Sequence, residues 1–332
     1  MGYTTNMKKN IIILIPIFIL ELLSIYYLKS NYQIKQIIWF LLGLISLFII
    51  INLKEKYLKK LSIFLYLLSI ILLIVVLFHP YTNGSRGWLK LYKFSIQPSE
   101  ITKFSLILIS FYLPNNTFKS KILYLLSFLI PSILTFIEPD TGAVIIYGII
   151  FLYFLPKFLS KKEIFIFFIV FIFLIISLLY LYIYKKDTFI DIFNTSIYYR
   201  LDRLTSFKNQ DNMQVNNALI SLASGKLLYF PEANNDFFFA YLLSKSSINF
   251  LFILSSYFLI LLILIFYKQP LSNLLFYILA FQIIENIGMN LNLLPVIGIP
   301  LPFLSYGGSH TISTFLMLGL ALRKFNNNHS TN

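Results

Sequence analysis

The chain has 332 residues, of which 58% are hydrophobic and only 12% are charged. A water-soluble domain cannot bury that much apolar surface, so the composition excludes a soluble globular protein and indicates the lipid bilayer as solvent. The formal net charge is +14, but the basic residues form short clusters between apolar runs, which is typical of membrane topology and not of nucleic-acid binding. With no cysteine and three histidines without paired spacing, we expect no disulfide, thiolate or histidine-ligated metal chemistry.

Ten apolar segments are predicted to cross the membrane, because a spanning helix needs about 20 apolar residues. Six are clear, at 11–28, 35–53, 61–79, 163–184, 250–267 and 272–290. Four are shorter or interrupted by proline or acidic residues, at 100–113, 122–137, 142–157 and 303–323. The predicted fold is a single all-α polytopic membrane domain that comprises residues 1–332.

The basic clusters predict the orientation of this domain. With ten spans they all fall on one side, at 8–9, 54–60, 119–121, 157–162, 268 and 323–324. The positive-inside rule assigns that side to the cytoplasm, together with both termini. Two long extracytoplasmic loops then lie at about 80–99 and about 185–249, the second between spans seven and eight. A loop of that length is uncommon unless it has a function. Its stretch SIYYRLDRLTSF has the helical spacing of an amphipathic helix on the membrane surface.

Four segments on the predicted outer side carry polar chemistry, and the first is NGSRGWLKLYKFSIQPSEITKF. It holds three cations, Arg86, Lys90 and Lys93. Cations on the translocated side oppose the usual loop bias, so they suggest an anionic ligand such as a phosphate. After Pro98 a helix begins, in which Ser99 can be the N-cap and Glu100 can pair with Lys103. The structural alternative is a capped helix with lysines that reach the membrane interface.

The second segment, TFIEPDTGAVII, places Glu138 and Asp140 between two apolar stretches. A charge at the centre of the bilayer costs about 2.5–3.5 kcal/mol on insertion scales, so both acids are expected at the membrane edge or beside a cavity. A simple turn between two spans explains the segment equally well.

The third segment, YFPEANNDFFFA, brings together two of the 13 acidic residues of the chain. Pro231 suits the first turn of a helix, and Glu232 would lie at the positive end of its dipole. Asp236 follows one turn later, on the same predicted face. The alternative is one capping acid and one solvated acid.

The fourth segment, LLPVIGIPLPFLSYGGSHTIS, is rich in proline and glycine just before the last predicted span. Irregular backbone at membrane depth must be buried in protein or line a cavity. Ser305, Tyr306 and Ser309 can supply hydrogen bonds there, and His310 is interpreted as a packed or cavity-edge side chain and not as a metal ligand.

In order along the chain, SRGWLK…QPSEITKF, EPDTGA, YYRLDRLTSF, FPEANNDFFFA and NIGMNLNLLPVIGIPLPFLSYGGS resemble the signature segments of the SEDS family, which comprises RodA, FtsW and SpoVE. The resemblance covers about 84–320, and GIPLPFLSYGGS is its most specific part. Departures from the family pattern are the Asn234-Asn235 pair where His-Thr is usual, His310 where a second serine is usual, and a nearly absent glycine-rich stretch before the Pro-Glu pair.

The resemblance implies a peptidoglycan glycosyltransferase of the bacterial cytoplasmic membrane that polymerises lipid II on the outer face. It implies a class B penicillin-binding protein and other cell-wall elongation proteins as partners, and no nucleic acid. The last signature is nearer to the RodA branch, which favours elongation and cell shape over division or sporulation. A lipid II flippase and a non-catalytic scaffold for the penicillin-binding protein are the competing interpretations.

The resemblance also assigns roles to residues. The family's essential aspartate falls on Asp236, which we expect to act as general base, with Glu232 orienting it or sharing an Mg²⁺ or Mn²⁺ ion with it. No organic cofactor is expected. The expected substrate-binding residues are Arg86, Lys90, Glu100, Lys103, Arg200, Arg203, Ser305 and Tyr306.

Overall fold

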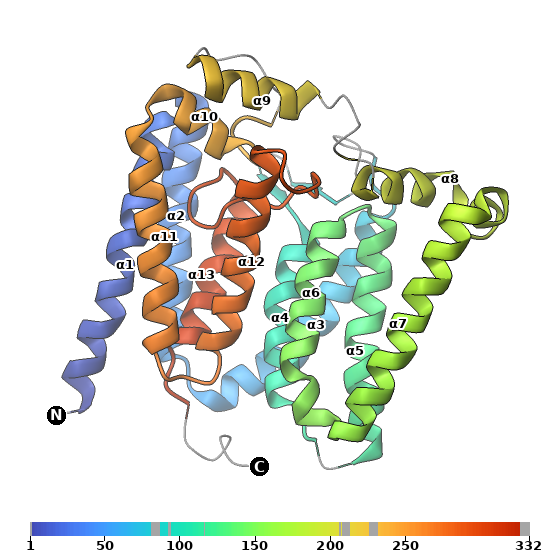
Figure 1. Cartoon of the computed structure of the whole chain (residues 1–332). Coiled ribbons are helices and arrows are strands. Elements are labelled where there is room, and N and C mark those ends of the chain that lie inside the picture. Colours follow the sequence, from blue (N-terminus) through green and yellow to red (C-terminus); the bar gives the residue numbers. More distant parts are fainter. Residues whose placement is uncertain are drawn as a thin grey trace.

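The structure is a computed structural model that describes residues 2–80, 87–91, 94–115, 117–205, 207, 213–225 and 232–325. Helices dominate these residues, as the composition predicts (Figure 1). The helices are α1 (Gly2–Tyr27), α2 (Ser30–Asn52), α3 (Glu55–Val76), α4 (Pro98–Tyr112), α5 (Phe118–Ile137), α6 (Thr141–Phe158), α7 (Lys161–Tyr184), α8 (Lys186–Thr205), α9 (Met213–Ser224), α10 (Phe238–Lys245), α11 (Ile248–Phe266), α12 (Ser272–Asn290) and α13 (Gly308–Leu322).

The long helices stand side by side as a bundle, with α1, α2, α11, α12 and α13 in one half and α3 to α7 in the other (Figure 1). In the core, α2 packs against α13, α3 against α4, and α1 against α11. Helices α8, α9 and α10 lie across one end of the bundle, and α1 begins and α13 ends at the opposite end. The helices that follow the four polar segments, α4, α6, α10 and α13, all begin near the end with α8 to α10, so the described parts of these segments lie at that end.

Each of the ten predicted spans coincides with a helix, namely α1 to α7 and α11 to α13. Among the described residues, seven of these are long and apolar enough to cross a membrane: α2, α3, α5, α6, α7, α11 and α12. The apolar parts of α1 and α13 are shorter, and α4 has only 15 residues. The polytopic all-α fold is confirmed, while the exact number of crossings stays a prediction.

Helix α7 shows most clearly that lipid is the solvent. A capping box starts this helix: Ser160 Oγ accepts from the Glu163 amide, and Glu163 Oε2 accepts from the Ser160 amide at 2.7 Å. Lys121 on α5 pairs with the same Glu163 carboxylate at 2.6 Å. Beyond this anchor, α7 has 24 residues with a mean hydropathy of 3.2 over its most apolar window and no buried side chain. A helix that is apolar all round and not covered by protein needs a membrane.

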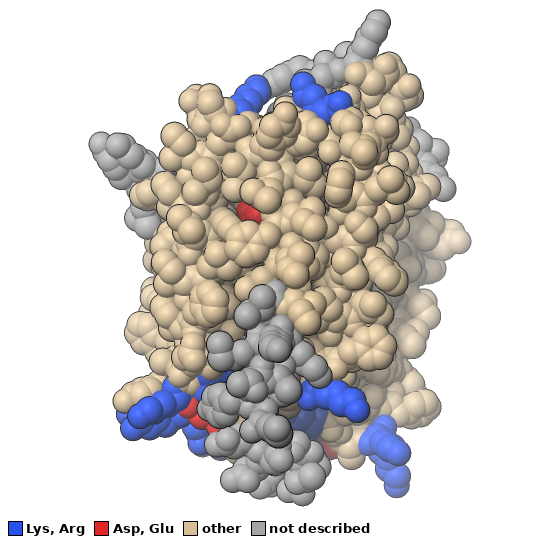
Figure 2. Space-filling view, turned by 90° about the vertical axis from the view of Figure 1, so that its left-hand side faces the viewer, with Lys and Arg blue, Asp and Glu red and all other residues tan. Residues whose placement is uncertain are grey.

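On the face drawn in Figure 2, basic side chains gather at both ends, and the broad band between them is almost free of charged side chains. Such a band between two charged rims is the expected surface of a membrane-spanning bundle.

Two features of the loops differ from the sequence-based picture. The predicted loop 80–99 contains a small antiparallel hairpin, β1 (Leu89–Leu91) and β2 (Phe94–Ile96), in which Leu89 pairs with Ile96. Strands of three residues are too short to produce a recognisable alternation, so the all-α prediction missed them. The predicted loop 185–249 is largely helical, since α8, α9 and α10 lie within it. Its stretch SIYYRLDRLTSF falls mostly in α8, so the predicted helix is present, and its position on a membrane surface stays a prediction.

Two basic residues that the sequence marks only as topology signals also close helix ends. Lys157 Nζ on α6 donates to the last carbonyls of α4, those of Ser110 (2.9 Å), Phe111 (2.7 Å) and Leu113 (3.0 Å). Arg323 Nη1, just after α13, donates to the carbonyls of Ile50 (2.7 Å) and Ile51 (3.1 Å) near the end of α2. Positive charge at a helix C-terminus pairs unsatisfied carbonyls and favours the dipole.

Replacing Lys157 by Met keeps the length of the side chain and removes its ammonium group. The expected result is a loss of about 1–3 kcal/mol of stability, because carbonyls at the end of α4 lose a charged donor. The apparent melting temperature of the detergent-solubilised protein measures this loss. Lys162→Met, at an exposed position near the start of α7, is the control and should leave the melting temperature within about a degree of wild type. Equal melting temperatures for both variants would contradict the capping role.

Candidate functional site

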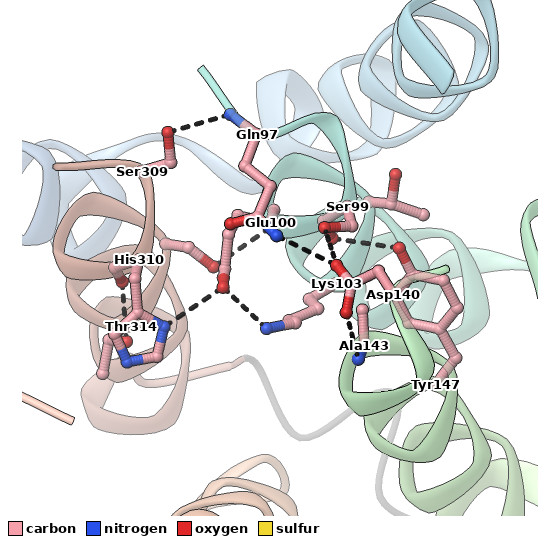
Figure 3. Close-up of polar contacts among 12 residues, drawn as sticks. Gln97, Ser99, Glu100, Lys103, Asp140, Ala143, Tyr147, Ser309, His310 and Thr314 are labelled. Carbon is pink, nitrogen blue, oxygen red and sulfur yellow. Dashed lines mark hydrogen bonds and ion pairs between the residues drawn. The ribbon is translucent and has the colours of Figure 1, made fainter. Parts of the chain in front are cut away.

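The first cluster of the site forms around Asp140, the N-cap of α6 (Figure 3). Its Oδ1 accepts from the Ala143 amide at 3.0 Å, which holds the first turn of α6. Its Oδ2 accepts from Ser99 Oγ at 2.8 Å and from Gln97 Nε2 at 2.9 Å. A carboxylate is favourable at a helix N-terminus, and here it also joins the start of α6 to the start of α4. The acid therefore does more than the simple turn that the sequence allowed.

This arrangement overturns the predicted cap of α4. Gln97 is at the N-cap position and Pro98 is the first helical residue, while the hydroxyl of Ser99 turns away to Asp140. The competing acceptor lies about 40 residues away in the sequence, so local pattern could not reveal it. The backbone N–H of Gln97 donates to Ser309 Oγ, at the start of α13, at 3.1 Å.

The predicted pair of Glu100 and Lys103 is present, and it lies deep between α4 and α13 (Figure 3). Glu100 Oε1 is 2.8 Å from Lys103 Nζ and 3.1 Å from His310 Nδ1, and all three residues are buried. Ser313 on α13 donates to the Glu100 carbonyl at 3.1 Å. Taking two charges out of water is costly unless further hydrogen bonds satisfy them, and His310 provides one such contact to the carboxylate. In this conformation Lys103 is therefore part of a helix–helix contact and does not face an open surface.

The second cluster surrounds Asp236. The prediction of a helix that starts at Pro231 is wrong for the described part: Glu232 to Phe237 form turns, and α10 begins at Phe238. Pro231 itself lies outside the described residues. Glu232 and Asp236 thus do not share a helix face. The amides of Asn235 and Phe237 both donate to the Glu232 carbonyl, each at 3.1 Å, and close these turns.

A side chain of α12 explains why the helix does not start earlier. In a continuous helix the Ala240 amide would donate to the Asp236 carbonyl. Here Asn290 stands between the two groups: its Oδ1 accepts from the Ala240 amide at 3.1 Å, and its Nδ2 donates to the Asp236 carbonyl at 3.0 Å. Asn286, one turn earlier on α12, donates through Nδ2 to the same carbonyl at 2.8 Å and to the Ile299 carbonyl at 2.7 Å. The two buried asparagines hold the backbone of Asp236 against α12.

The irregular segment 291–307 packs on the other side of Asp236. Ser305 Oγ donates to the Asn235 carbonyl at 2.7 Å and accepts from the Leu301 amide at 3.0 Å. The Tyr306 amide donates to the Asn234 carbonyl at 3.0 Å. Through its two bonds the buried Ser305 hydroxyl joins the turn at Asn235 to the 291–307 segment. The half-buried Tyr306 ring packs edge-on against Tyr32, with centroids 4.9 Å apart.

Gly298 leaves room for the Asp236 carboxylate. It has a φ of +77°, which L-residues with a side chain rarely adopt. A Cβ atom at this position would lie 3.4 Å from Asp236 Oδ2. The glycine thus lets the backbone of the 291–307 segment pass directly beside the carboxylate.

The electrostatic surroundings of Asp236 favour its protonated form. Partial burial raises the pKa of Asp236 to about 7, and the negative charges of Glu232 and Asp140 add to this shift. The charge of Asp140 therefore acts electrostatically on Asp236, and the two clusters form one site. Burial likewise raises the pKa of Glu138 to about 8, and the charge of Asp140 contributes.

The remaining expected site residues are placed only in part. Lys90 is exposed on β1, and Arg86 lies outside the described residues. Arg200 and Arg203 are on α8, but their side chains are not among those described. The structure brings together Glu100, Lys103, Asp140, Asp236, Ser305 and Tyr306, and it leaves the roles of the three arginines as predictions.

In the part of the chain that the structure describes, no group of three or more His, Cys, Asp or Glu side chains is arranged to hold a metal ion. The side chains alone therefore do not fit a protein-only site for Mg²⁺ or Mn²⁺. Mg²⁺ commonly takes one or two carboxylates and completes its shell with substrate phosphates and water.

A family model described as Cell cycle protein, which represents FtsW, RodA and SpoVE, matches residues 6–329. The chain belongs to this family. Among curated relatives it is 32% identical to the "Probable peptidoglycan glycosyltransferase FtsW" of Coxiella burnetii, over 88% of this chain and 86% of that protein. It is 29% identical to the protein of the same name from Nitrosococcus halophilus, over 89% of this chain and 82% of that protein.

Two solved structures share the fold. One is described as "Structural coordination of polymerization and crosslinking by a peptidoglycan synthase complex", with a TM-score of 0.74, 23% identity, and 93% of this chain and 95% of that chain covered. The other is the rod shape determining protein RodA of Thermus thermophilus, with a TM-score of 0.61, 23% identity, and 93% and 94% covered. The resemblance to the SEDS family is thus confirmed. The leaning towards the RodA branch is not supported, since the two curated relatives are named FtsW.

Replacing Asn286 by Leu keeps the approximate volume and removes the donor to two buried carbonyls. A stability loss of about 1–3 kcal/mol is expected, because the carbonyls of Asp236 and Ile299 each lose a partner. Thermal unfolding in detergent measures it. Asn52→Leu is the control: its amide bonds only within its own helix at an exposed position, so its melting temperature should match wild type. An unchanged melting temperature for Asn286→Leu would show that the Asn286 hydrogen bonds do not stabilise the backbone at Asp236 and Ile299.

Proposed function

We propose that the chain is a peptidoglycan glycosyltransferase that transfers the growing glycan from its undecaprenyl diphosphate carrier to the GlcNAc 4-hydroxyl of lipid II. Membership of the FtsW/RodA/SpoVE family and the names of the relatives support this activity. The observation that carries it is the placement of Asp236. Its backbone is held by Asn286 and Asn290, and its partly exposed carboxylate lies beside Gly298, near the end of the bundle where α8 to α10 lie.

In the proposed reaction, Asp236 accepts the proton of the 4-hydroxyl as that oxygen attacks C1 of the donor MurNAc. The O4–C1 bond forms, the bond from C1 to the diphosphate oxygen breaks, and the anomeric centre inverts to a β-1,4 linkage. A general base contributes about 10²–10⁴-fold, and it works best when its pKa lies near the working pH. The shift of the Asp236 pKa to about 7 meets that condition.

The leaving diphosphate needs positive charge close to it. The cations proposed for this task are those of the outer loops, Arg86, Lys90, Arg200 and Arg203. Lys103 is engaged by Glu100 and would need to be released before it could bind a phosphate. An Mg²⁺ or Mn²⁺ ion stays part of the proposal only as an ion that the diphosphate itself helps to bind.

The cellular role is proposed from the relatives. The name FtsW favours division over elongation, which reverses the order that the sequence suggested. We propose the outer face of the bacterial cytoplasmic membrane as the site of reaction, with both termini in the cytoplasm. A class B penicillin-binding protein is the proposed partner, supported by the fold match to a complex that couples polymerisation with crosslinking.

Replacing Asp236 by Asn or Ala should abolish polymerisation of labelled lipid II, with a loss of at least about 100-fold, because the proposed general base is removed. The assay uses the full chain with its cognate penicillin-binding protein and separates glycan strands by gel electrophoresis. Asp191→Asn, an exposed acid on α8, is the matched control and should keep wild-type activity.

Three outcomes decide between the candidate functions. Strands from wild type and the control, but not from the Asp236 variants, support the polymerase and its base. Equal strands from all four proteins would retain the polymerase and move the base elsewhere. An intact wild-type complex that makes no strands would favour the flippase or the scaffold.

The pH profile tests the base independently. Because Asp236 must be ionised to accept a proton and its pKa is raised to about 7, activity should fall about tenfold per pH unit below that value. Glu232→Gln removes one of the charges that raise this pKa, so the acidic limb should move to lower pH. The measurement is the initial polymerisation rate at a series of pH values, with Asp191→Asn as control. An acidic limb at the same pH in the Glu232 variant would contradict the assignment.

A further inference from the structure

Glu21 is a buried acid in the apolar part of α1, away from the cluster described above. It lies six residues before the end of α1, and Gln36 lies six residues after the start of α2, which places both about 9 Å from the connection between the two helices. Both side chains have no exposed surface. Gln36 Nε2 donates to Glu21 Oε2 at 3.0 Å. An ionised group at such a depth is costly unless it is paired, so the contacts of Glu21 indicate how its charge is accommodated.

The other oxygen of each group is the informative atom. Glu21 Oε1 and Gln36 Oε1 are both buried and neither has a hydrogen-bond partner. An amide oxygen and an ionised carboxylate oxygen can only accept hydrogen bonds, so neither can satisfy the other. The ion pairs among the described residues involve Glu100 and Glu163 as acids and not Glu21. An ionised Glu21 would therefore remain an uncompensated charge inside the bundle.

A single proton resolves both deficits. A carboxylic acid and a primary amide can face each other and form two parallel hydrogen bonds in a closed ring. One bond is already present, from Gln36 Nε2 to Glu21 Oε2. A proton on Glu21 Oε1 would be the donor of the second, to Gln36 Oε1. We infer that Glu21 binds a proton permanently and forms with Gln36 a neutral, doubly hydrogen-bonded acid–amide pair that fastens α1 to α2.

A monovalent cation is the competing occupant. Ser24, three residues along the same face of α1, also has a buried hydroxyl oxygen without a partner, so three oxygens could approach an ion. A cation would need further ligands, whereas the proton satisfies both acceptor atoms of the pair without any. The proton is therefore the better account, and the cation becomes an outcome of the test.

The charge of this pair matters for a neighbouring contact. Tyr257 on α11 lies within electrostatic reach of Glu21, and its hydroxyl donates to the Pro302 carbonyl at 2.8 Å. Pro302 belongs to the irregular segment 291–307, which packs against Asp236. A neutral Glu21 leaves this hydrogen bond free of an adjacent negative charge.

Infrared spectroscopy of the full chain in detergent tests the proton directly. The wild-type spectrum minus that of Glu21→Gln should contain the C=O stretch of one protonated carboxyl group at about pH 7, where an exposed glutamate is ionised. Asp191→Asn is the control and should remove no such band, because Asp191 is exposed. Gln36→Leu keeps Glu21 and removes its partner, so its band should persist at a shifted frequency. This second variant keeps the test valid if Glu21→Gln does not fold.

Stability against pH gives an independent readout. Glu21→Gln can form the same ring between two amides, so it should melt within a few degrees of wild type at about pH 5. Wild type should then lose stability as pH rises, because the unfolded chain releases the proton that the folded chain holds. The melting temperature of Glu21→Gln minus that of wild type should therefore increase with pH. A missing carboxyl band and a constant difference would overturn the proposal, and a stabilisation by Na⁺ over choline that Glu21→Gln abolishes would assign the site to a cation.

Discussion

Irregular backbone can persist among apolar helices only if its amides and carbonyls are paired within the protein, and two asparagines of α12 meet this requirement next to Asp236. Asn290 replaces a helical hydrogen bond with two bonds of its own, and Asn286 joins the Asp236 and Ile299 carbonyls. Without them, α10 would be free to extend backwards through Asp236. The turn that presents the carboxylate therefore exists because of tertiary contacts and not because of local propensity.

The same requirement arranges the opposite partners of the site. Asp140 satisfies the start of α6 and two side chains of α4, so the carboxylate that shifts the pKa of Asp236 is itself fixed by three hydrogen bonds. At the other end of α4 and α6, Lys157 satisfies the carbonyls of α4. Charged side chains at both ends of α4 and α6 thus pair helix ends that would otherwise leave backbone groups unsatisfied.

The sequence predicted what depends on composition and could not predict what depends on distant contacts. The apolar runs placed all ten helices of the bundle, α1 to α7 and α11 to α13, because length and hydrophobicity decide whether a segment can lie in lipid. The predicted cap at Ser99 failed because Asp140 attracts its hydroxyl. The resemblance located Asp236, but the sequence analysis did not predict that Asn286 and Asn290 bind its backbone carbonyl. Two asparagines one turn apart in an otherwise apolar helix are a pattern from which this contact could have been suspected.

Glu21 and Asp236 are two acids whose charge is disfavoured by burial, and access to the surface separates them. Glu21 is fully enclosed by apolar helices, so a proton bound there has no path to a reactant and can only support structure. Asp236 is similarly disfavoured as an anion, but it is partly exposed near one end of the bundle and lies beside a glycine that leaves its oxygen uncovered. A carboxylate that holds its proton weakly near neutral pH and can exchange it with a bound hydroxyl is suited to general-base catalysis. The fold thus uses one physical effect, the cost of burying a charge, for a structural pair in one place and for a proposed catalytic base in another.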